Sequence, residues 1–250
     1  MARRTEQIFG LHAVNQILET SPDRILSVWI QEAINSESVK VIHQQVNTLG
    51  ASVQVVPRAT LSRMTKNQNH QGVIIEIKPA KKKTDDDLGG ILELNKDNNP
   101  LYLILDSVQD PHNLGACIRT ADAAGVTAII IPKDRSASIN ETVRKVASGA
   151  VENVTILSVV NLVRVVKKMK EAGIWVVGTA GGAEQSIYDM NMNVPTAIIM
   201  GGEGKGMRES ILKECDYVAS LPILGKIESL NVSVATGVVL YEVIRQRGAK

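Results

Sequence analysis

One helix-like segment of this chain contains a long charged side chain among small residues. The segment DPHNLGACIRTADAAG, residues 110–125, places Arg119 near its middle. An arginine keeps its positive charge in proteins and can form two parallel hydrogen bonds to a phosphate or a carboxylate. The position therefore predicts one of two roles for Arg119: contact with an anionic ligand, or a structural salt bridge to Asp122 or Glu203.

A glycine-rich turn follows the apolar stretch TAIIM. It reads GGEGKGMRES, residues 201–210, and Glu203 lies at its centre. A phosphate-binding P-loop needs Ser or Thr after the lysine, but Gly206 follows Lys205 here, and the GxGxxG pattern is also absent. Nucleotide hydrolysis and nicotinamide-dependent chemistry therefore lose support. The glycines still permit a ligand to approach the backbone closely, and Glu203 either contacts that ligand or lies in solvent.

Three polar residues at alternate positions surround the start of another predicted helix. In LPILGKIESLNVSVATGVVLYEVIRQR, residues 221–247, they are Ser229, Asn231 and Ser233. Serine and asparagine commonly cap helices, but a single cap does not account for three such residues. The apolar side chains whose helical spacing predicts one face of this helix are Val234, Val238, Tyr241 and Ile244.

These segments must be positioned by the elements that precede them. The stretches LYLILD, TAIIIP, NVTILS, IWVVGTA and TAIIMGG are typical of buried strands and alternate with segments of helix length. Such a pattern predicts an α/β domain with a mostly parallel sheet covered on both faces, over residues 99–250. Ligands bind beyond the carboxyl ends of the strands in sheets of this kind, so we expect a site at the turns after LYLILD, IWVVG and TAIIM.

Residues 1–78 predict a smaller α/β domain, because strand-like and helix-like patterns alternate. Helices are expected at 10–18 and 38–49, and strands at 25–30, 53–56 and 72–77. Residues 79–98 include PAKKKTDDD, where a lysine run meets an aspartate run. This composition predicts a flexible linker, with a phosphate-binding patch as the alternative.

Composition restricts the classes of protein further. The net charge of +2 creates no strong overall field for nucleic acid, so any RNA contact must come from local patches. Cys117 and Cys215 lie far apart without metal-ligand spacing, which favours reduced thiols and no metal site. No segment is typical of a signal peptide or a membrane span. We expect a cytoplasmic protein.

Taken together, the three segments resemble the three signature motifs of the SpoU group of RNA 2′-O-ribose methyltransferases, within the SPOUT superfamily. The motifs stand here as DPHNLGACIRTADAAG, IIMGGEGKGM and LPILGKIESLNVSVATGVVLYE. FGLHAV near the start and NHQGV at residues 69–73 are similar to the amino-terminal domain of the branch that methylates large-subunit rRNA. The resemblance covers nearly the whole chain apart from the linker.

The resemblance implies both a fold and a cofactor. It implies a deep trefoil knot in the carboxyl-terminal domain, an L30e-like amino-terminal domain that binds RNA, and a homodimer formed through the knotted domain. S-adenosylmethionine would lie bent inside the knotted loops, held largely by backbone groups. The positions that the family uses for this contact are Thr179, Gly201, Leu221 and Leu230.

The implied reaction transfers a methyl group from S-adenosylmethionine to the ribose 2′-hydroxyl of a guanosine in large-subunit (23S) rRNA. A ribose hydroxyl is a weak acid, so its proton must be removed or the developing alkoxide stabilised. Arginine is hard to deprotonate, and we therefore expect Arg119 to act as a fixed cation that points at the ribose and its phosphate, rather than as a base. The family positions around the hydroxyl are Asn113, Arg119, Glu203, Ser229 and Asn231.

Four other residues are candidates for RNA contact. His12 and His70 lie in the motifs of the first domain, where each could instead be a packing residue. Arg144 and Lys145, in ETVRKVASGA, could grip a phosphate or lie on a solvated helix face.

Two further functions stay open. A tRNA ribose methyltransferase would use the same chemistry, although members of that branch generally carry short helical extensions instead of an amino-terminal α/β domain. A non-catalytic RNA-binding or ribosome-assembly protein of the same fold would not need all five candidate catalytic residues.

Overall fold

The structure is a computed structural model that describes residues 5–79, 83–204 and 206–248. The chain forms two compact units, Met1–Lys81 and Lys82–Lys250. The residues that lie outside the described ranges include Arg3 and Arg4 near the amino terminus, residues 80–82 of the predicted linker, and Lys205 of the glycine turn.

The first unit is a four-stranded sheet with helices, which confirms the small α/β domain. The strands lie in the order β1-β4-β2-β3; β4 runs antiparallel to β1 and β2, and β3 runs parallel to β2. Val14 and Ile17 pack with Val28, Ile42 and Ile75 in its core. The elements are β1 (Glu6–Phe9), α1 (Leu11–Thr20), a 3-10 turn (Pro22–Arg24), β2 (Ile25–Gln31), α2 (Glu37–Thr48), β3 (Ser52–Val56), α3 (Arg58–Met64) and β4 (Val73–Ile77).

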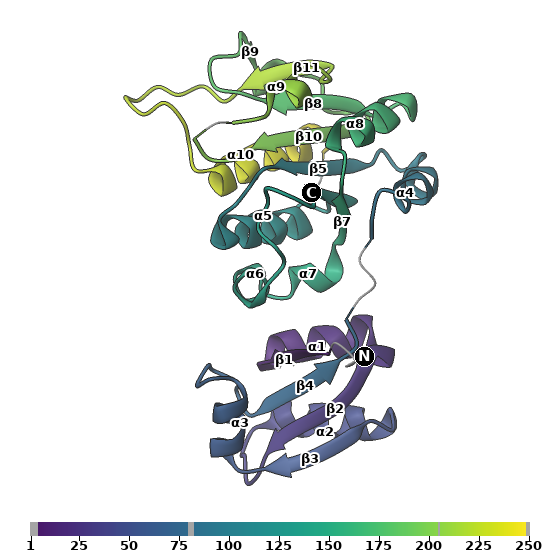
Figure 1. Ribbon diagram of the computed structural model, residues 1–250, viewed down its shortest axis with the longest axis vertical. Coiled ribbons are helices and arrows are strands. Elements are labelled where there is room, and N and C mark those ends of the chain that lie inside the picture. Colours follow the sequence, from purple (N-terminus) through teal and green to yellow (C-terminus); the bar gives the residue numbers. More distant parts are fainter. Residues whose placement is uncertain (1–4, 80–82, 205, 249–250) are drawn as a thin grey trace. The chain divides into compact units, whose positions relative to one another are not determined.

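The second unit is a seven-stranded sheet with the order β7-β6-β5-β10-β8-β11-β9, and all neighbouring strands run parallel. Figure 1 shows helices on both faces of this sheet, as the sequence predicts. The strands are β5 (Leu101–Asp106), β6 (Ala128–Pro132), β7 (Thr155–Val159), β8 (Trp175–Thr179), β9 (Gln185–Ser186), β10 (Thr196–Gly201) and β11 (Tyr217–Ser220). The helices are α4 (Leu88–Asn95), α5 (Pro111–Ala123), α6 (Glu141–Ala147), α7 (Ala150–Asn153), α8 (Leu162–Glu171), α9 (Glu209–Leu212) and α10 (Val232–Gln246), with a 3-10 turn at Ile187–Asp189.

Side chains alternate between the two faces of β5, and every residue of this strand is buried. Leu103 and Leu105 pack with α5 and α10 on one face, whereas Tyr102 and Ile104 pack with α4 and α8 on the other. Burial on both faces explains why this strand reads as a continuous apolar run.

The prediction of a flexible linker over residues 79–98 is wrong for most of that range. Leu88 and Leu92 of α4 are buried against the second unit. Lys83 forms an isolated bridge with Leu157 of β7, and the Asp85 carboxylate accepts a hydrogen bond from the Val160 amide at 3.0 Å. Two leucines one helical turn apart are enough to dock this short helix. A pattern of only two apolar residues next to a charged run does not predict a buried helix.

The apolar face that the sequence predicts for α10 is also not the buried one. The buried residues are instead Val232, Thr236, Val239, Leu240, Glu242 and Val243. Val234 and Tyr241 each keep 53% of their surface exposed. Helix α10 carries apolar residues on more than one face, and spacing alone does not tell which of them meets α5.

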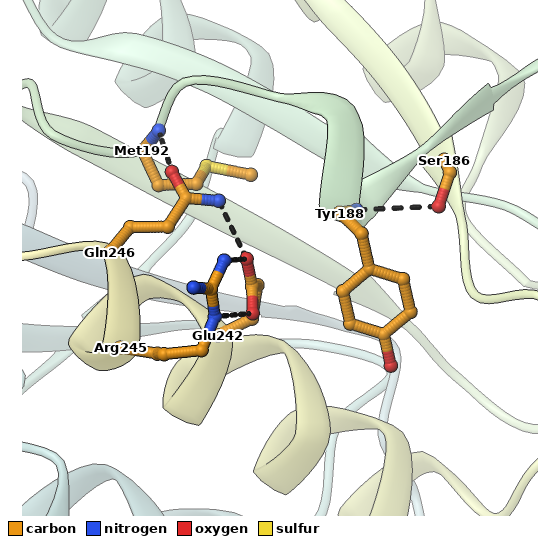
Figure 2. A network of polar contacts seen from close by, with 6 residues as sticks. All are labelled: Ser186, Tyr188, Met192, Glu242, Arg245 and Gln246. Atoms are coloured by element: carbon orange, nitrogen blue, oxygen red, sulfur yellow. Dashed lines mark hydrogen bonds and ion pairs between the residues drawn. The ribbon is translucent and has the colours of Figure 1, made fainter.

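The carboxyl-terminal half of α10 is fastened to the loop before β10 by polar side chains (Figure 2). Gln246 accepts a hydrogen bond from the Met192 amide at 2.8 Å and donates one to Glu242 at 2.7 Å. Arg245 donates to the same carboxylate, and these bonds lower the pKa of Glu242 to about 2. The last turn of α10 is therefore tied to this loop. No helix in the described ranges is long and apolar enough to cross a membrane.

Candidate active site

The carboxyl ends of four adjacent strands bring the predicted turns to one edge of the second sheet. Strands β5, β10, β8 and β11 are neighbours in that order. The Gly202 amide after β10 donates to the Asp106 carbonyl at the end of β5, over 2.7 Å, and the Ala180 amide after β8 donates to Ala219 in β11, over 3.0 Å. A Cβ added to Gly181 would lie 3.8 Å from the Glu228 carbonyl oxygen. The expected convergence of these turns is confirmed.

Three of the five predicted catalytic side chains form one hydrogen-bonded chain. The Asn113 amide nitrogen donates to the Glu203 carboxylate, and the Asn231 amide nitrogen donates to the Asn113 carbonyl oxygen at 3.0 Å. The Asn231 oxygen caps α10 by accepting from the Ser233 amide at 2.9 Å and from its hydroxyl at 2.7 Å. Each of the three signature segments thus supplies one member of this chain, which we call the amide network: Asn113, Glu203 and Asn231.

Asn113 has its orientation fixed by both partners. The Asp110 carboxylate accepts from the His112 amide at 3.0 Å and caps α5, so the first turn of this helix is held in place. Asn113 itself is buried and uses its nitrogen for Glu203 and its oxygen for Asn231. A side chain held in this way is pre-organised to orient a ligand group.

Arg119 and Ser229 lie outside the amide network. Both side chains are exposed, and within the described ranges neither forms an ion pair or a side-chain hydrogen bond. In the described ranges Arg119 forms no salt bridge with Asp122 or Glu203; Asp122 accepts from Asn153 at 3.0 Å, and Glu203 accepts from Asn113. The guanidinium is therefore free to contact a ligand or another chain.

A buried ion pair that the sequence reasoning missed closes the glycine turn. Asp106 is fully buried, and its carboxylate accepts from the Arg208 backbone amide at 2.9 Å and from the Arg208 Nε at 2.7 Å. The Asp106 carbonyl accepts from Gly202 at 2.7 Å. Residues on both sides of Glu203 are thus tied to one aspartate. An acidic residue at the end of the otherwise apolar LYLILD was the available signal.

The replacement Arg208→Ala is expected to destabilise the second unit by about 3 kcal/mol, because a buried carboxylate would lose its charged partner. Chemical unfolding of the full chain measures the change. Lys213→Ala is a matched control, since Lys213 forms an exposed ion pair with Glu209 at 2.7 Å, and we expect a loss below about 1 kcal/mol there. Equal losses in the two variants would contradict the structural role of Asp106.

The four positions predicted for cofactor contact all lie at this edge. The Thr179 hydroxyl donates to the Ile199 carbonyl at 2.9 Å, so it ties β8 to β10. A Cβ on Gly201 would lie 2.3 Å from backbone atoms of Gly206 and Met207, and therefore only glycine fits there. Leu221 packs partly against the core, whereas Leu230 is exposed.

The two cysteines are not poised for chemistry. The Cys117 thiol is buried 3.5 Å from the Thr236 hydroxyl, and burial raises its pKa to about 11. Burial and nearby acidic groups raise the pKa of Cys215 to about 11 as well. Both thiols are therefore protonated near neutral pH. In the part of the chain that the structure describes, no three His, Cys, Asp or Glu side chains are grouped to hold a metal.

The four tentative RNA contacts lie in different settings. His12 and Lys145 are exposed, but Arg144 forms an ion pair with Glu152. His70 is buried; its Nδ1 accepts from the Gly72 amide at 3.0 Å and its Nε2 lies 3.3 Å from the Ser62 hydroxyl. Direct RNA contact by His70 is therefore wrong, because the ring is inside the protein and both nitrogens are used.

His70 makes the stability of the chain depend on pH. Burial, together with the charge of Arg58, lowers the pKa of His70 below its ordinary value of 6.5. Its contribution to folding is complete above pH 6.5 and is lost as the pH falls through the lowered value. We expect the free energy of unfolding to fall less steeply between pH 7 and pH 5 in His70→Leu than in the unchanged protein, as urea titrations would show; parallel slopes would contradict this assignment.

Comparison with known proteins finds a family model for each of the two units. The model of the SpoU rRNA Methylase family matches residues 100–241. The chain belongs to this family. A second family model, RNA 2′-O ribose methyltransferase substrate binding, matches residues 7–83. The family resemblance stated from the sequence is therefore confirmed.

Relatives within the family extend over nearly the full chain. The 23S rRNA (guanosine-2′-O-)-methyltransferase RlmB of Haemophilus influenzae is 48% identical over 244 residues, covering 97% of this chain and 98% of the relative. RlmB of Yersinia pestis is 44% identical over 246 residues, covering 98% and 99%.

Two solved structures align with different shares of this chain. An AdoMet-bound rRNA methyltransferase from Sinorhizobium meliloti has a TM-score of 0.81 at 25% identity and covers 97% of this chain and 87% of its own. The TrmH/SpoU tRNA modifying enzyme of A. aeolicus has a TM-score of 0.56 at 32% identity, covering 65% of this chain and 83% of its own.

Proposed function

We propose that this protein transfers a methyl group from S-adenosylmethionine to the ribose 2′-hydroxyl of a guanosine in 23S rRNA. The observation that carries the proposal is the full-length similarity to RlmB enzymes at 44 to 48% identity. The amide network supports it, because it joins the three signature segments through residues that the family places around the hydroxyl.

The turns at the sheet edge are chemically suited to hold S-adenosylmethionine. Gly181 is exposed and leaves its backbone uncovered by a side chain, and Leu230 and Ile227 expose apolar surface that an adenosine could cover. Thr179, Gly201, Leu221 and Leu230 would hold the cofactor. When bound, the cofactor would supply an electrophilic methyl group on its sulfonium sulfur, and the rest of the cofactor would be the leaving group, as a neutral thioether.

The candidate catalytic side chains would orient the ribose and stabilise the charge that develops on its 2′-oxygen. Asn113, held between Glu203 and Asn231, can orient the hydroxyl, and Ser229 is exposed beside Asn231 for a further hydrogen bond. Arg119 would lower the free energy of the developing alkoxide by its fixed charge or would grip the neighbouring phosphate. Because an arginine is hard to deprotonate, we do not assign it the role of base.

We further propose a homodimer formed through the second unit, with a trefoil knot at the site. The exposed apolar side chains Val234 and Tyr241 on α10 support the dimer, since contiguous exposed apolar surface marks contact sites. The return of the chain from β11 to α5, where Asn231 meets Asn113, supports the knot. The free thiols and the rRNA substrate support a cytoplasmic location.

The tRNA alternative has less support. The tRNA modifying enzyme of A. aeolicus covers 65% of this chain, whereas the two RlmB relatives cover 97 to 98%. The match of residues 7–83 to the substrate-binding model is consistent with this difference, and we propose that the L30e-like first unit binds rRNA. Lys145 on α6 is a candidate for a further phosphate contact, whereas the pairing of Arg144 with Glu152 makes that residue less available.

A nucleotide-resolved map of ribose 2′-O-methylation, in rRNA and tRNA from cells with and without the gene, tests the proposal. We expect one guanosine in 23S rRNA to lose its methyl group when the gene is deleted. Loss of a mark in tRNA alone would overturn the choice of substrate. An unchanged map, together with no methyl transfer by the purified protein, would favour the non-catalytic RNA-binding alternative.

A further inference from the structure

The loop between α3 and β4 of the first unit holds an unfavourable backbone conformation. Lys66, Asn67 and Gln71 have φ values of 52°, 62° and 52°, and Gly72 has 86°. Left-handed conformations cost free energy in residues other than glycine, and they persist only where the surroundings enforce them.

Buried and backbone hydrogen bonds hold this loop to two helices. His70 joins it to Ser62 of α3, at 3.3 Å, and to the Gly72 amide, at 3.0 Å. The Gln71 side-chain oxygen accepts from the Leu11 amide at the start of α1, at 2.9 Å. The Asn67 amide donates to the Ser62 carbonyl at 2.7 Å. The loop, the start of α1 and helix α3 therefore form one rigid surface.

This surface presents polar side chains without intramolecular partners. The set, which we call the loop-end surface, consists of His12, Arg58, Arg63, Lys66, Asn67 and Asn69, and all six are exposed. Within the described ranges none of them forms a side-chain hydrogen bond or an ion pair. The charge of Arg58 is felt by His70, which places Arg58 beside the loop. Glu32 and Glu37 follow β2 at the same end of the sheet, but Glu37 pairs with Lys40 at 3.5 Å.

We infer that the loop-end surface binds the sugar-phosphate backbone of RNA. Three cations supply the charge that phosphates require, and the two asparagines and the imidazole can donate hydrogen bonds to phosphate and ribose oxygens. The rigid loop fixes these groups before binding, so little entropy is lost. The inference rests on the proposed function and assigns its RNA contact to a defined face.

The chemistry of this surface favours backbone contact over base recognition. Sequence-specific RNA readers commonly stack unpaired bases on aromatic side chains. The six residues include no Phe, Tyr or Trp, and Trp29 of this unit donates its ring N–H to Gln54 on the neighbouring strand β3. We therefore expect affinity from this surface to depend on salt more than on sequence.

The test compares two variants of the full chain that each lose two positive charges. Arg63→Gln/Lys66→Gln removes cations of the loop-end surface, and Lys78→Gln/Arg164→Gln removes one exposed cation at the other end of β4 and one on α8 of the second unit. Arg58 is left in place because its charge acts on the buried His70. Binding to unmethylated 23S rRNA made by in vitro transcription is measured over a series of KCl concentrations, together with KM and kcat for methylation.

We expect the loop-end variant to bind the transcript about 10-fold more weakly and to raise KM to a similar extent, with kcat within about 2-fold. The slope of log affinity against log salt should fall by roughly 1 to 2, as for two lost phosphate contacts. Arg63→Lys should restore most of the affinity because it keeps the charge. The control variant should behave as the unchanged protein.

Equal RNA affinities and equal KM values in the two variants would overturn the inference. So would an unchanged RNA affinity of the loop-end variant combined with weaker binding to ribosome precursor particles, because that result would point to an acidic protein partner. The proposed function fails separately. If the transcript binds through the loop-end surface but receives no methyl group, the inference stands and the assigned reaction does not.

Discussion

Arg119→Ala is expected to reduce kcat about 10²- to 10³-fold, the effect typical of removing one group that stabilises a developing oxyanion. The affinity for S-adenosylmethionine and the free energy of unfolding should remain nearly unchanged, because the Arg119 side chain is exposed and forms no hydrogen bond or ion pair within the described parts of the second unit. Single-turnover methylation of 23S rRNA and calorimetric titration of the cofactor measure these quantities.

Arg164→Ala is the matched control, since Arg164 is an exposed arginine on α8, and it should retain full activity. Arg119→Lys separates the possible roles. A lysine keeps the charge but loses the planar pair of donors, so an intermediate rate would favour electrostatic stabilisation. Near-full activity of Arg119→Lys would contradict both the clamp and the base.

Mixed dimers would show which protomer supplies Arg119. The Arg119 guanidinium forms no hydrogen bond or ion pair with the amide network of its own chain. We therefore expect it to act on the partner's site. Mixing Arg119→Ala with Asn113→Ala should then restore part of the activity, because one of the two sites in a mixed dimer would be intact. Absence of any recovery after subunit exchange would place Arg119 in its own protomer's site.

A second large effect is expected at the exposed face of α10. Val234→Asp/Tyr241→Asp would place four carboxylates across a two-fold interface and should yield a monomer, with methylation falling about 100-fold or more if the site is complete only in the dimer. Light scattering gives the mass of the particle, and the methylation assay gives its activity.

The fold itself should tolerate this double substitution, because both side chains are about half exposed in the single chain. Val160→Asp is the control for a charge placed on exposed apolar surface, since Val160 is 74% exposed at another position in the same unit. A fully active monomer would refute the proposed dimer requirement, whereas an unchanged dimer would move the interface to a different surface.

The sheet and the location of the site could be predicted from the sequence because each depends on local pattern. Runs such as LYLILD read as buried parallel strands, and glycine turns after them mark the edge where ligands bind. The three signature segments also identified Asn113, Glu203 and Asn231 before their contacts were known.

What could not be predicted depends on partners far away in the chain. The Asp106 carboxylate meets Arg208, about one hundred residues later, and only the pairing of β5 with β10 brings them together. His70 looks the same in sequence whether it faces RNA or a serine of α3. The docked helix at the end of the predicted linker could not be predicted, because two leucines of α4 give too short a pattern beside a run of lysines and aspartates.

Helix α10 connects part of the candidate active site, an exposed apolar face and the loop before β10. Its cap, Asn231, belongs to the amide network, its middle carries the exposed apolar face, and its last turn is fixed to Met192 through Gln246. Because a helix moves nearly as a rigid body, a displacement of its last turn would also displace Asn231 at its first turn. A double-mutant cycle between Asn231 and Gln246, which lie four turns apart, tests this coupling: additive effects on the methylation rate would show that the two ends of the helix act independently.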